Sequence, residues 1–127
     1  MESLNKVVLD TNMLLSIVEL KIDVFEEVRK KLGNCQFVII EPVQKELLML
    51  SKQGKKQSLK ARIADRLIKL NHAKLLKVKE KTADLALEKL GANGYIIATN
   101  DKELRKNIKA KNGTTIFIKQ KKFIEIE

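Results

Sequence analysis

The apolar residues of this chain fall into short continuous runs and into longer segments that repeat with helical spacing. The short runs predict strands at residues 6–10, 36–41, 75–78, 95–99 and 115–119, with a short final strand at 123–126. The longer segments predict helices at residues 12–19, 23–32, 42–52, 55–72, 83–90 and 101–111. This alternation favours an α/β fold with a central parallel sheet of about five strands, joined by right-handed crossovers.

Residues with known preferences for helix ends mark where three of the predicted helices begin or end. Pro42 suits the first turn of its helix, where a backbone N–H has no partner in any case. Thr82 can cap the helix that follows it, and Gly91 is placed to end that helix. Asn100 and Glu103 have the spacing of a capping box, which predicts Asn100 as the N-cap of the last helix.

Two of the predicted strands lead directly into polar segments that contain an aspartate. Asp10 and Asp101 each follow a short run of apolar residues of the kind found in strands buried on both faces. Ligands of such sheets bind outside the carboxyl ends of the strands, so the two acids are expected in one crevice. Two further acids, Glu46 and Asp84, lie in the first turns of helices that follow other strands. Four carboxylates at one edge repel each other unless a cation lies between them, and Mg²⁺ or Mn²⁺ prefers such oxygen ligands.

Each of these acids also has an ordinary structural interpretation. Asp10 can cap the helix that follows it, and Asp84 and Asp101 suit the positive ends of their helix dipoles. Glu46 differs, because it lies beside Leu47 and is expected to project towards the buried side of its helix. A carboxylate in that position must be paired, hydrogen-bonded or bound to a metal.

Length and composition narrow the class of protein. The length of 127 residues predicts a single domain over residues 1–127. An excess of 26 basic over 16 acidic residues gives a formal net charge of +10, which favours an anionic partner, with nucleic acid the leading candidate. The single cysteine, Cys35, excludes an internal disulfide and a thiolate zinc site, and the single histidine, His72, argues against serine- or cysteine-type triads. No apolar stretch approaches the roughly 20 residues of a membrane helix, and the N-terminus has no signal-peptide pattern, so a cytoplasmic protein with no membrane contact is expected.

Other α/β sites suit the sequence less well. The chain contains no G-x-G-x-x-G and no P-loop motif, so dinucleotide and nucleoside triphosphate sites lack their phosphate cradle. A phosphoaspartate phosphatase would need a second aspartate two residues after Asp10, where this chain has Asn12.

The polar motifs occur in an order that resembles the PIN-domain ribonucleases. The series consists of Val-Val-Leu-Asp-Thr-Asn at residues 7–12, Pro-Val-Gln-Lys-Glu-Leu at 42–47, Thr-Ala-Asp at 82–84 and Ile-Ala-Thr-Asn-Asp-Lys-Glu-Leu-Arg at 97–105. It covers nearly the whole chain and looks closest to archaeal PIN proteins similar to pre-ribosomal-RNA processing nucleases, with VapC toxins next.

The resemblance implies a three-layer α/β/α fold and an Mg²⁺- or Mn²⁺-dependent endoribonuclease site. It implies that four acids bind the metal and carry the catalysis: Asp10, Glu46, Asp84 and Asp101. It also implies three supporting polar residues: Thr11, Asn12 and Thr99. One position departs from the family pattern, because many relatives have a second acid directly after the third motif aspartate, and here that residue is Leu85.

A helical stripe of basic residues follows Asp101 and supplies a candidate RNA-binding surface. Its members recur at positions i, i+3, i+4 and i+7, and they are Lys102, Arg105, Lys106 and Lys109. Leu104 and Ile108 are expected on the inner side of the same helix. A solvated face without a partner is the alternative interpretation, whereas the overall positive charge favours phosphate binding.

Three functions remain open from the sequence. The leading hypothesis is a metal-dependent endoribonuclease that hydrolyses RNA phosphodiester bonds, with ribosomal-RNA processing as one role. The alternatives are a non-catalytic RNA-binding or ribosome-assembly protein with the same fold, and a VapC-type toxin ribonuclease. The expected partner is RNA, either single-stranded or structured ribosomal RNA, and a homodimer, an antitoxin or a ribosome-assembly partner are open alternatives.

Overall fold

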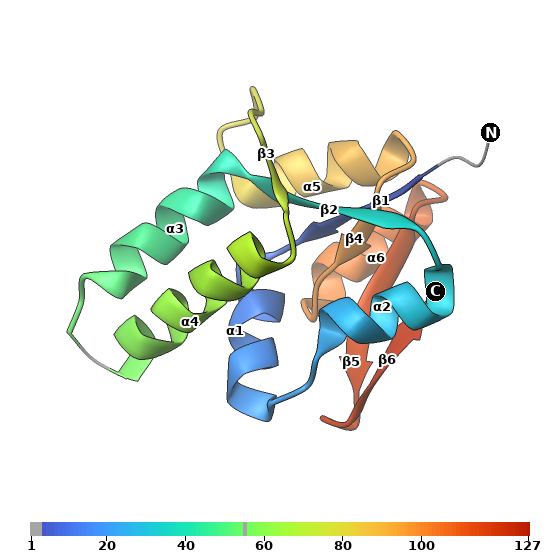
Figure 1. Cartoon of the computed structure of the whole chain (residues 1–127). Helices are drawn as coiled ribbons and strands as arrows, with labels where there is room; N and C mark the ends of the chain where they lie inside the picture. Colours follow the sequence, from blue (N-terminus) through green and yellow to red (C-terminus); the bar gives the residue numbers. More distant parts are fainter. Residues whose placement is uncertain (1–3, 55) are drawn as a thin grey trace.

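The computed structural model describes residues 4–54 and 56–127, which fold into a sheet flanked by helices (Figure 1). The strands are β1 (Asn5–Leu9), β2 (Cys35–Ile40), β3 (Lys74–Leu76), β4 (Ile96–Ala98), β5 (Thr114–Lys119) and β6 (Phe123–Ile126). The helices are α1 (Thr11–Leu20), α2 (Val24–Leu32), α3 (Glu41–Ser51), α4 (Lys56–Leu70), α5 (Ala83–Ala92) and α6 (Lys102–Ala110). The predicted start of the fourth helix at residue 55 lies outside the described residues.

One sheet carries all of the described strands, in the order β3-β2-β1-β4-β5-β6. The first five strands in this order are parallel, with Val8 of β1 aligned to Val38 of β2 and to Ile97 of β4. The last strand, β6, pairs antiparallel with β5. The predicted parallel sheet of about five strands is therefore confirmed, and residues 123–126 add the short final strand at its edge.

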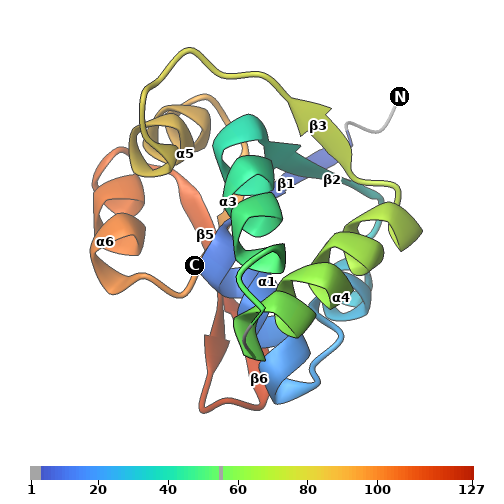
Figure 2. The same ribbon diagram turned by 90° about the vertical axis from the view of Figure 1, so that its left-hand side faces the viewer.

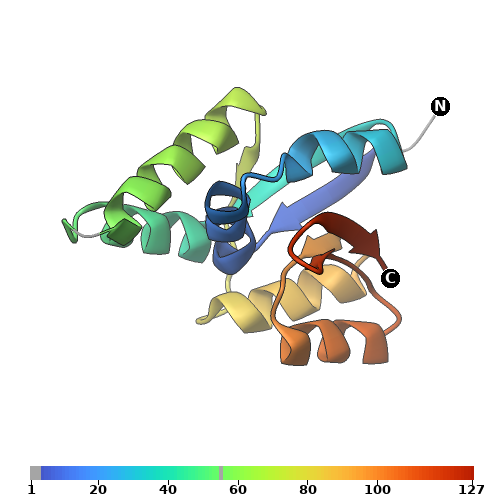
Figure 3. The same cartoon turned by 90° about the horizontal axis from the view of Figure 1, so that it is seen from below.

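Helices cover both faces of the sheet and form the outer layers of the predicted three-layer α/β/α arrangement. Figures 2 and 3 show α5 and α6 on one face, with α1, α2 and α4 on the other. Helix α3 begins directly after β2 and packs beside α4. None of the helices in the described part of the chain is long and apolar enough to span a membrane.

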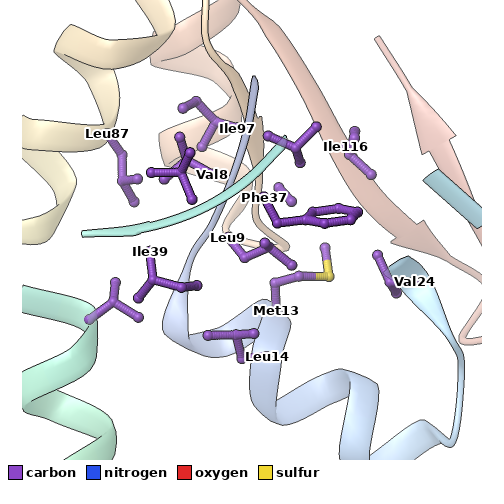
Figure 4. Packing of buried hydrophobic residues seen from close by; sticks show 14 of the residues in the cluster. Val8, Leu9, Met13, Leu14, Val24, Phe37, Ile39, Leu87, Ile97 and Ile116 are labelled. Atoms are coloured by element: carbon purple, nitrogen blue, oxygen red, sulfur yellow. The ribbon is translucent and has the colours of Figure 1, made fainter. Parts of the chain in front are cut away.

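The central strand β1 is buried on both faces, as its apolar sequence predicts. Val7, Val8 and Leu9 are completely inaccessible, and the side chains around them come from both helical layers (Figure 4). Phe25 of α2 meets Phe37 of β2 edge to face, with ring centroids 4.8 Å apart. Such offset aromatic contacts add stability beyond the apolar area that they bury. The core thus fixes β1 between its neighbours and sets where its polar end emerges.

The prediction that Gly91 ends its helix is wrong. Helix α5 continues to Ala92, and Gly91 is buried inside it. A Cβ atom at this position would lie 3.1 Å from Cγ2 of Ile108 on α6, which is closer than an ordinary van der Waals contact. The glycine therefore allows α5 and α6 to approach each other. Gly94, with a φ of 93°, provides the left-handed turn after the helix.

Helix α4 exposes several of its large apolar residues to solvent, which are Leu59, Ile63 and Leu70. Leu59 and Leu70 are 61% and 65% exposed, whereas Ala61 and Ala64 are buried. The small alanine side chains lie on the side of α4 that faces its neighbouring helices α1 and α3. Close packing of α4 therefore uses its alanines, and its larger apolar residues are only partly used in the core.

Candidate active site

The carboxyl ends of β1 and β4 lie next to each other in the middle of the sheet. The chain moves outwards from β1 through β2 to β3, and then returns to the other side of β1 to form β4. Ligand sites of parallel α/β sheets lie at this kind of switch in strand order. The backbone N–H of Asp10 donates to the carbonyl of Ala98, 2.9 Å away, which joins the two strand ends. The predicted meeting of polar residues from β1 and β4 follows from this pairing.

The carboxylate of Asp10 is held from three directions. Its Oδ1 accepts the backbone N–H of Thr11 at 2.8 Å, so Asp10 caps α1. Its Oδ2 accepts Nδ2 of Asn12 at 3.0 Å and the hydroxyl of Thr99 at 3.0 Å. The capping interpretation and the site interpretation of Asp10 are thus compatible, because the cap uses only one of its two oxygens.

Asp101 begins the last helix, and the prediction that Asn100 would do so is wrong. The side chain of Asp101 accepts the backbone N–H of Leu104 at 3.1 Å, as an N-cap does. Its own backbone N–H donates to the Thr99 hydroxyl at 3.2 Å. Since the same hydroxyl donates to Asp10, Thr99 is the direct link between Asp10 and Asp101.

Asn100 and Ser16 form a supporting network that the sequence interpretation missed. The Nδ2 of Asn100 donates to the Ser16 hydroxyl of α1 at 3.1 Å, and its Oδ1 accepts the N–H of Ile118 of β5 at 2.9 Å. The backbone N–H of Asn100 donates to Oδ1 of Asn12 at 3.0 Å. These bonds fasten the loop between β4 and α6 to both neighbours. The sequence showed only that a polar residue lies between Thr99 and Asp101. The hydrogen-bond partners of this residue, Asn100, lie far away along the chain.

Asp84 lies in the first turn of α5, one residue after the start of the helix. Thr82 caps this helix by accepting the N–H of Leu85, as predicted. Partial burial raises the pKa of Asp84, and the negative charge of Asp101 raises it further. Smaller contributions of the same sign come from three more acids, which are Glu88, Glu103 and Glu46. Since repulsion with Asp10 acts in both directions, Asp84 experiences repulsion from all three of the other predicted site acids.

The expectation that Glu46 projects towards the buried side is wrong, because its side chain is exposed. Its helix neighbours Val43 and Leu47 are buried, so Glu46 lies beside the inward face and not on it. Glu46 still contributes to the repulsion that raises the pKa of both Asp10 and Asp84. Its charge thus acts on both aspartates from the exposed side of α3.

Burial is the main cause of the raised pKa of Asp10. The hydrogen bonds from Thr99 and Thr11 oppose this shift by stabilising the carboxylate, and the charges of Asp84 and Glu46 add to it. Charge repulsion thus connects Asp10 with Asp84 and Glu46, and a shared hydroxyl connects it with Asp101. The four predicted acids form one electrostatically coupled group.

The carboxylate oxygens of this group are the kind of ligand that a hard divalent cation prefers. A carboxylate can accept about four hydrogen bonds, and Asp10 accepts three, so one acceptor position on Oδ1 is left. Asp84 and Glu46 have no hydrogen-bond or ion-pair partner in the described part of the chain. As the side chains stand, no three acidic, histidine or cysteine side chains within residues 4–54 and 56–127 are close enough to hold one ion together. To hold one ion together, side chains of this group would have to lie closer to one another than they do here.

His72 cannot take part in this group. It lies just before β3, at the amino edge of the parallel sheet, whereas the four acids follow the carboxyl edge. The sequence contains no other histidine. Histidine therefore has no part in any proton transfer at the acidic edge.

The predicted basic stripe lies on α6, which starts next to Asp101. Lys102, Lys106 and Lys109 are exposed, whereas Arg105 is partly buried. Leu104 and Ile108 are buried on the inner side of the helix, as predicted. The arrangement of the stripe is therefore confirmed, and its role in binding RNA remains a prediction.

One family model and two named relatives match most of this chain. A family model described as "PIN like domain" matches residues 7–121. The chain is 33% identical to Ribonuclease VapC4 of Methanocaldococcus jannaschii, over 95% of each chain. It is 32% identical to Ribonuclease VapC9 of Archaeoglobus fulgidus, over 94% of this chain and 87% of the relative.

Two solved structures share the fold. The structure titled "Structure of the PIN domain endonuclease Utp24" aligns with a TM-score of 0.78 and 27% identity, and covers 96% of this chain and 90% of that one. A domain of a functionally unknown protein from Methanocaldococcus jannaschii aligns with a TM-score of 0.66 and 20% identity, over 91% of each chain. The second of these bears on the fold alone.

Proposed function

Because the chain belongs to the PIN-like domain family, we propose that it is a divalent-metal-dependent endoribonuclease that hydrolyses phosphodiester bonds of RNA. Two relatives of nearly equal length are named ribonucleases, and the solved structure of similar fold is titled an endonuclease. The observation that carries the proposal is the coupling of Asp10, Asp84, Glu46 and Asp101 at the switch point of the sheet.

In this proposal the four acids hold Mg²⁺ or Mn²⁺, and three polar residues hold the acids. When bound, the cation would supply an activated water and neutralise charge on the phosphate. Thr99 and Asn12 orient Oδ2 of Asp10 and leave a lone pair of Oδ1 available. The hydroxyl of Thr11 is buried and has no hydrogen-bond partner among the described residues. In this proposal its oxygen is a further ligand for the cation.

Metal-dependent cleavage of labelled RNA tests this function. We expect the wild-type protein to cut RNA with Mn²⁺ and to lose activity in a chelator. Asp101→Asn should abolish cutting without unfolding α6, because asparagine caps a helix about as well as aspartate does. Asp84→Asn should also abolish cutting, because it removes a proposed metal-binding carboxylate. It should leave the fold intact, since Asp84 makes no side-chain hydrogen bond among the described residues.

Asp23→Asn is the matched control for these variants. Asp23 caps α2 through the N–H of Glu26 at 3.0 Å, and it lies outside the acidic group. This variant should cut RNA at the wild-type rate. Cleavage that survives chelation, or equal losses in Asp23→Asn and Asp101→Asn, would contradict the proposal. RNA binding without cleavage under any metal condition would instead support the non-catalytic RNA-binding alternative.

A toxin-type ribonuclease is the second candidate. Its support is the similarity to two proteins named VapC along nearly their whole lengths. Expression of the wild-type chain should then stop growth of a host cell, and expression of Asp101→Asn should not. Normal growth with an active enzyme would favour the processing role, which cleavage of purified ribosomal RNA at a few defined positions would support.

A further inference from the structure

Arg105 is the most constrained basic residue of the stripe on α6. Its guanidinium lies over the ring of Phe117 of β5, 3.8 Å from the ring centroid, and only 15% of its side chain is exposed. Stacking of this kind stabilises a cation and fixes the plane of the guanidinium. Its Nε is buried and has no hydrogen-bond partner among the described residues. Arg105 is therefore a rigid cation with unused donor capacity.

The carboxylate of Glu127 lies between two of the basic residues. Its Oε1 is 3.2 Å from Nζ of Lys109 and 3.8 Å from a terminal nitrogen of Arg105. One carboxylate oxygen thus faces two cations. A phosphate oxygen of a nucleic acid carries a similar charge and makes similar contacts with arginine and lysine.

These residues line one surface pocket of about 310 Å³, together with Lys102 and Lys106. Neither of these two lysines lies within 4.0 Å of a carboxylate among the described residues, in contrast to Arg105 and Lys109. Seven residues at 1.5 Å each separate Lys102 from Lys109, so the row of cations extends for about 10 Å along the helix. Its near end adjoins Asp101, the N-cap of α6.

We propose that this pocket is a subsite for backbone phosphates of RNA, and that Glu127 occupies it as an internal anion that RNA must displace. The proposal rests on the ribonuclease function proposed above, since the row of cations leads to Asp101. Lys102 and Lys106 receive phosphate directly, whereas Arg105 and Lys109 exchange the Glu127 carboxylate for phosphate. Glu127 therefore lowers RNA affinity and favours substrates long enough to fill the subsite.

Glu127→Gln and Glu125→Gln form a closely matched pair of variants. Each removes one negative charge from β6 or its end, and each carboxylate side chain is 40% exposed and lies 3.2 Å from a lysine. Only Glu127 faces the pocket, because Glu125 pairs with Lys119. The difference between the two variants isolates the effect of the pocket from the general gain in positive charge.

Binding of a short labelled oligouridylate in chelator measures the effect without cleavage. Glu127→Gln should bind about two to five times more tightly than the wild type, which is the value of a surface ion pair converted to affinity. Glu125→Gln should bind within experimental error of the wild type. In a Lys109→Gln background, the gain from Glu127→Gln should shrink, as expected for residues that act on one site. Equal gains in both glutamine variants would overturn the proposal.

A second pair of variants tests the two unpaired lysines. Lys102→Gln with Lys106→Gln should reduce the slope of log affinity against log salt by roughly 1.4, since each contact with single-stranded nucleic acid contributes about 0.7. Lys121→Gln with Lys122→Gln removes the same charge from the exposed hairpin between β5 and β6 and should leave the slope nearly unchanged. Equal losses would overturn the subsite.

The two proposals fail in different ways. If the protein cleaves RNA and both pairs of variants bind alike, the subsite is wrong and the ribonuclease function stands. If the variants separate as expected but no metal supports cleavage, the subsite stands on a protein that binds RNA without cutting it.

Discussion

The hydroxyl of Thr99 lies 3.0 Å from Oδ2 of Asp10 and donates a hydrogen bond to it, although 89 residues separate the two along the chain. Thr99 is completely buried, and its oxygen also accepts the backbone N–H of Asp101. One small side chain thus sets the position of an acid from β1 relative to an acid from the loop after β4. This relationship is a direct consequence of the pairing between β1 and β4.

Thr99→Val should weaken the site while preserving its shape. Valine fills nearly the same volume but leaves the N–H of Asp101 without its partner and removes one of the two hydrogen bonds that Oδ2 of Asp10 accepts. A buried polar group that loses its partner costs about 1–3 kcal/mol, so the free energy of unfolding should fall by that amount. The stabilisation of the protein by Mn²⁺ should fall as well, because Asp10 loses a bond that favours its charged form. Chemical denaturation with and without Mn²⁺ measures both effects.

Thr115→Val is the control for this substitution. Thr115 is also completely buried, but its hydroxyl has no hydrogen-bond partner among the described residues. The same change should therefore leave the stability unchanged or increase it slightly. If both variants lost equal stability, the network around Thr99 would have no special role.

Asp84→Asn should have opposite effects without and with metal. Burial and the neighbouring acids raise the pKa of Asp84 above its ordinary 3.8, so the folded state favours the protonated form. The resulting stability is present below pH 3.8 and is lost as the pH rises through the raised value. At neutral pH the neutral asparagine removes this penalty, and the metal-free variant should be more stable by roughly 0.3–1 kcal/mol. The gain in melting temperature on adding Mn²⁺ should be smaller than in the wild type.

Asp65→Asn provides the contrasting case. Asp65 forms a 2.9 Å ion pair with Lys69 on α4. Removing its charge should slightly destabilise the metal-free protein at neutral pH and should leave the Mn²⁺ effect intact. A stabilised Asp65→Asn would mean that the gain in Asp84→Asn reflects something other than local repulsion.

The sequence was sufficient to predict the edge of the sheet where the acids gather. Runs such as Val7–Leu9 are typical of strands buried on both faces in a parallel sheet, and Asp10 and Asp101 follow two of these runs closely. The position of each acid along the chain therefore determined the edge on which it lies. Local sequence signals carried this part of the prediction.

The direction of individual side chains depended on contacts that are distant in sequence. Asn100 and Asp101 are both good helix caps, and the choice between them was made by Ser16 and Ile118, which bind the Asn100 side chain. The exposure of Glu46 followed from the way α3 packs beside α4, and a single helical stripe cannot specify that angle. Such errors of one residue or one helix face are expected where tertiary contacts decide.

The packing of α4 predicts that substitution of a buried alanine lowers the free energy of unfolding more than substitution of an exposed leucine. Leu59→Gln should change the free energy of unfolding by no more than about 0.5 kcal/mol, because Leu59 is 61% exposed. Ala64→Gln should cost roughly 1–3 kcal/mol or more, since Ala64 is fully buried and has no space for a longer polar side chain. Urea denaturation of the two variants gives the comparison. A larger loss in Leu59→Gln would mean that α4 packs through its leucine stripe.

Leu85→Glu places an acid directly after Asp84, which matches the family pattern that the sequence motifs resemble. Leu85 is 55% exposed, so the substitution buries no new charge and removes little apolar contact. It adds a carboxylate next to Asp84, which already experiences the repulsion of other acids. The metal-free variant should therefore melt at a lower temperature than the wild type. Its melting temperature should rise more on adding Mn²⁺, because a cation relieves the added repulsion as well. Lys81→Glu lowers the charge by two units at an exposed residue just before the Thr82 cap, so its response gives an upper bound for the general effect of added negative charge near α5. If the two variants responded equally to Mn²⁺, position 85 would have no direct part in metal binding, and the departure from the family pattern would not limit the site.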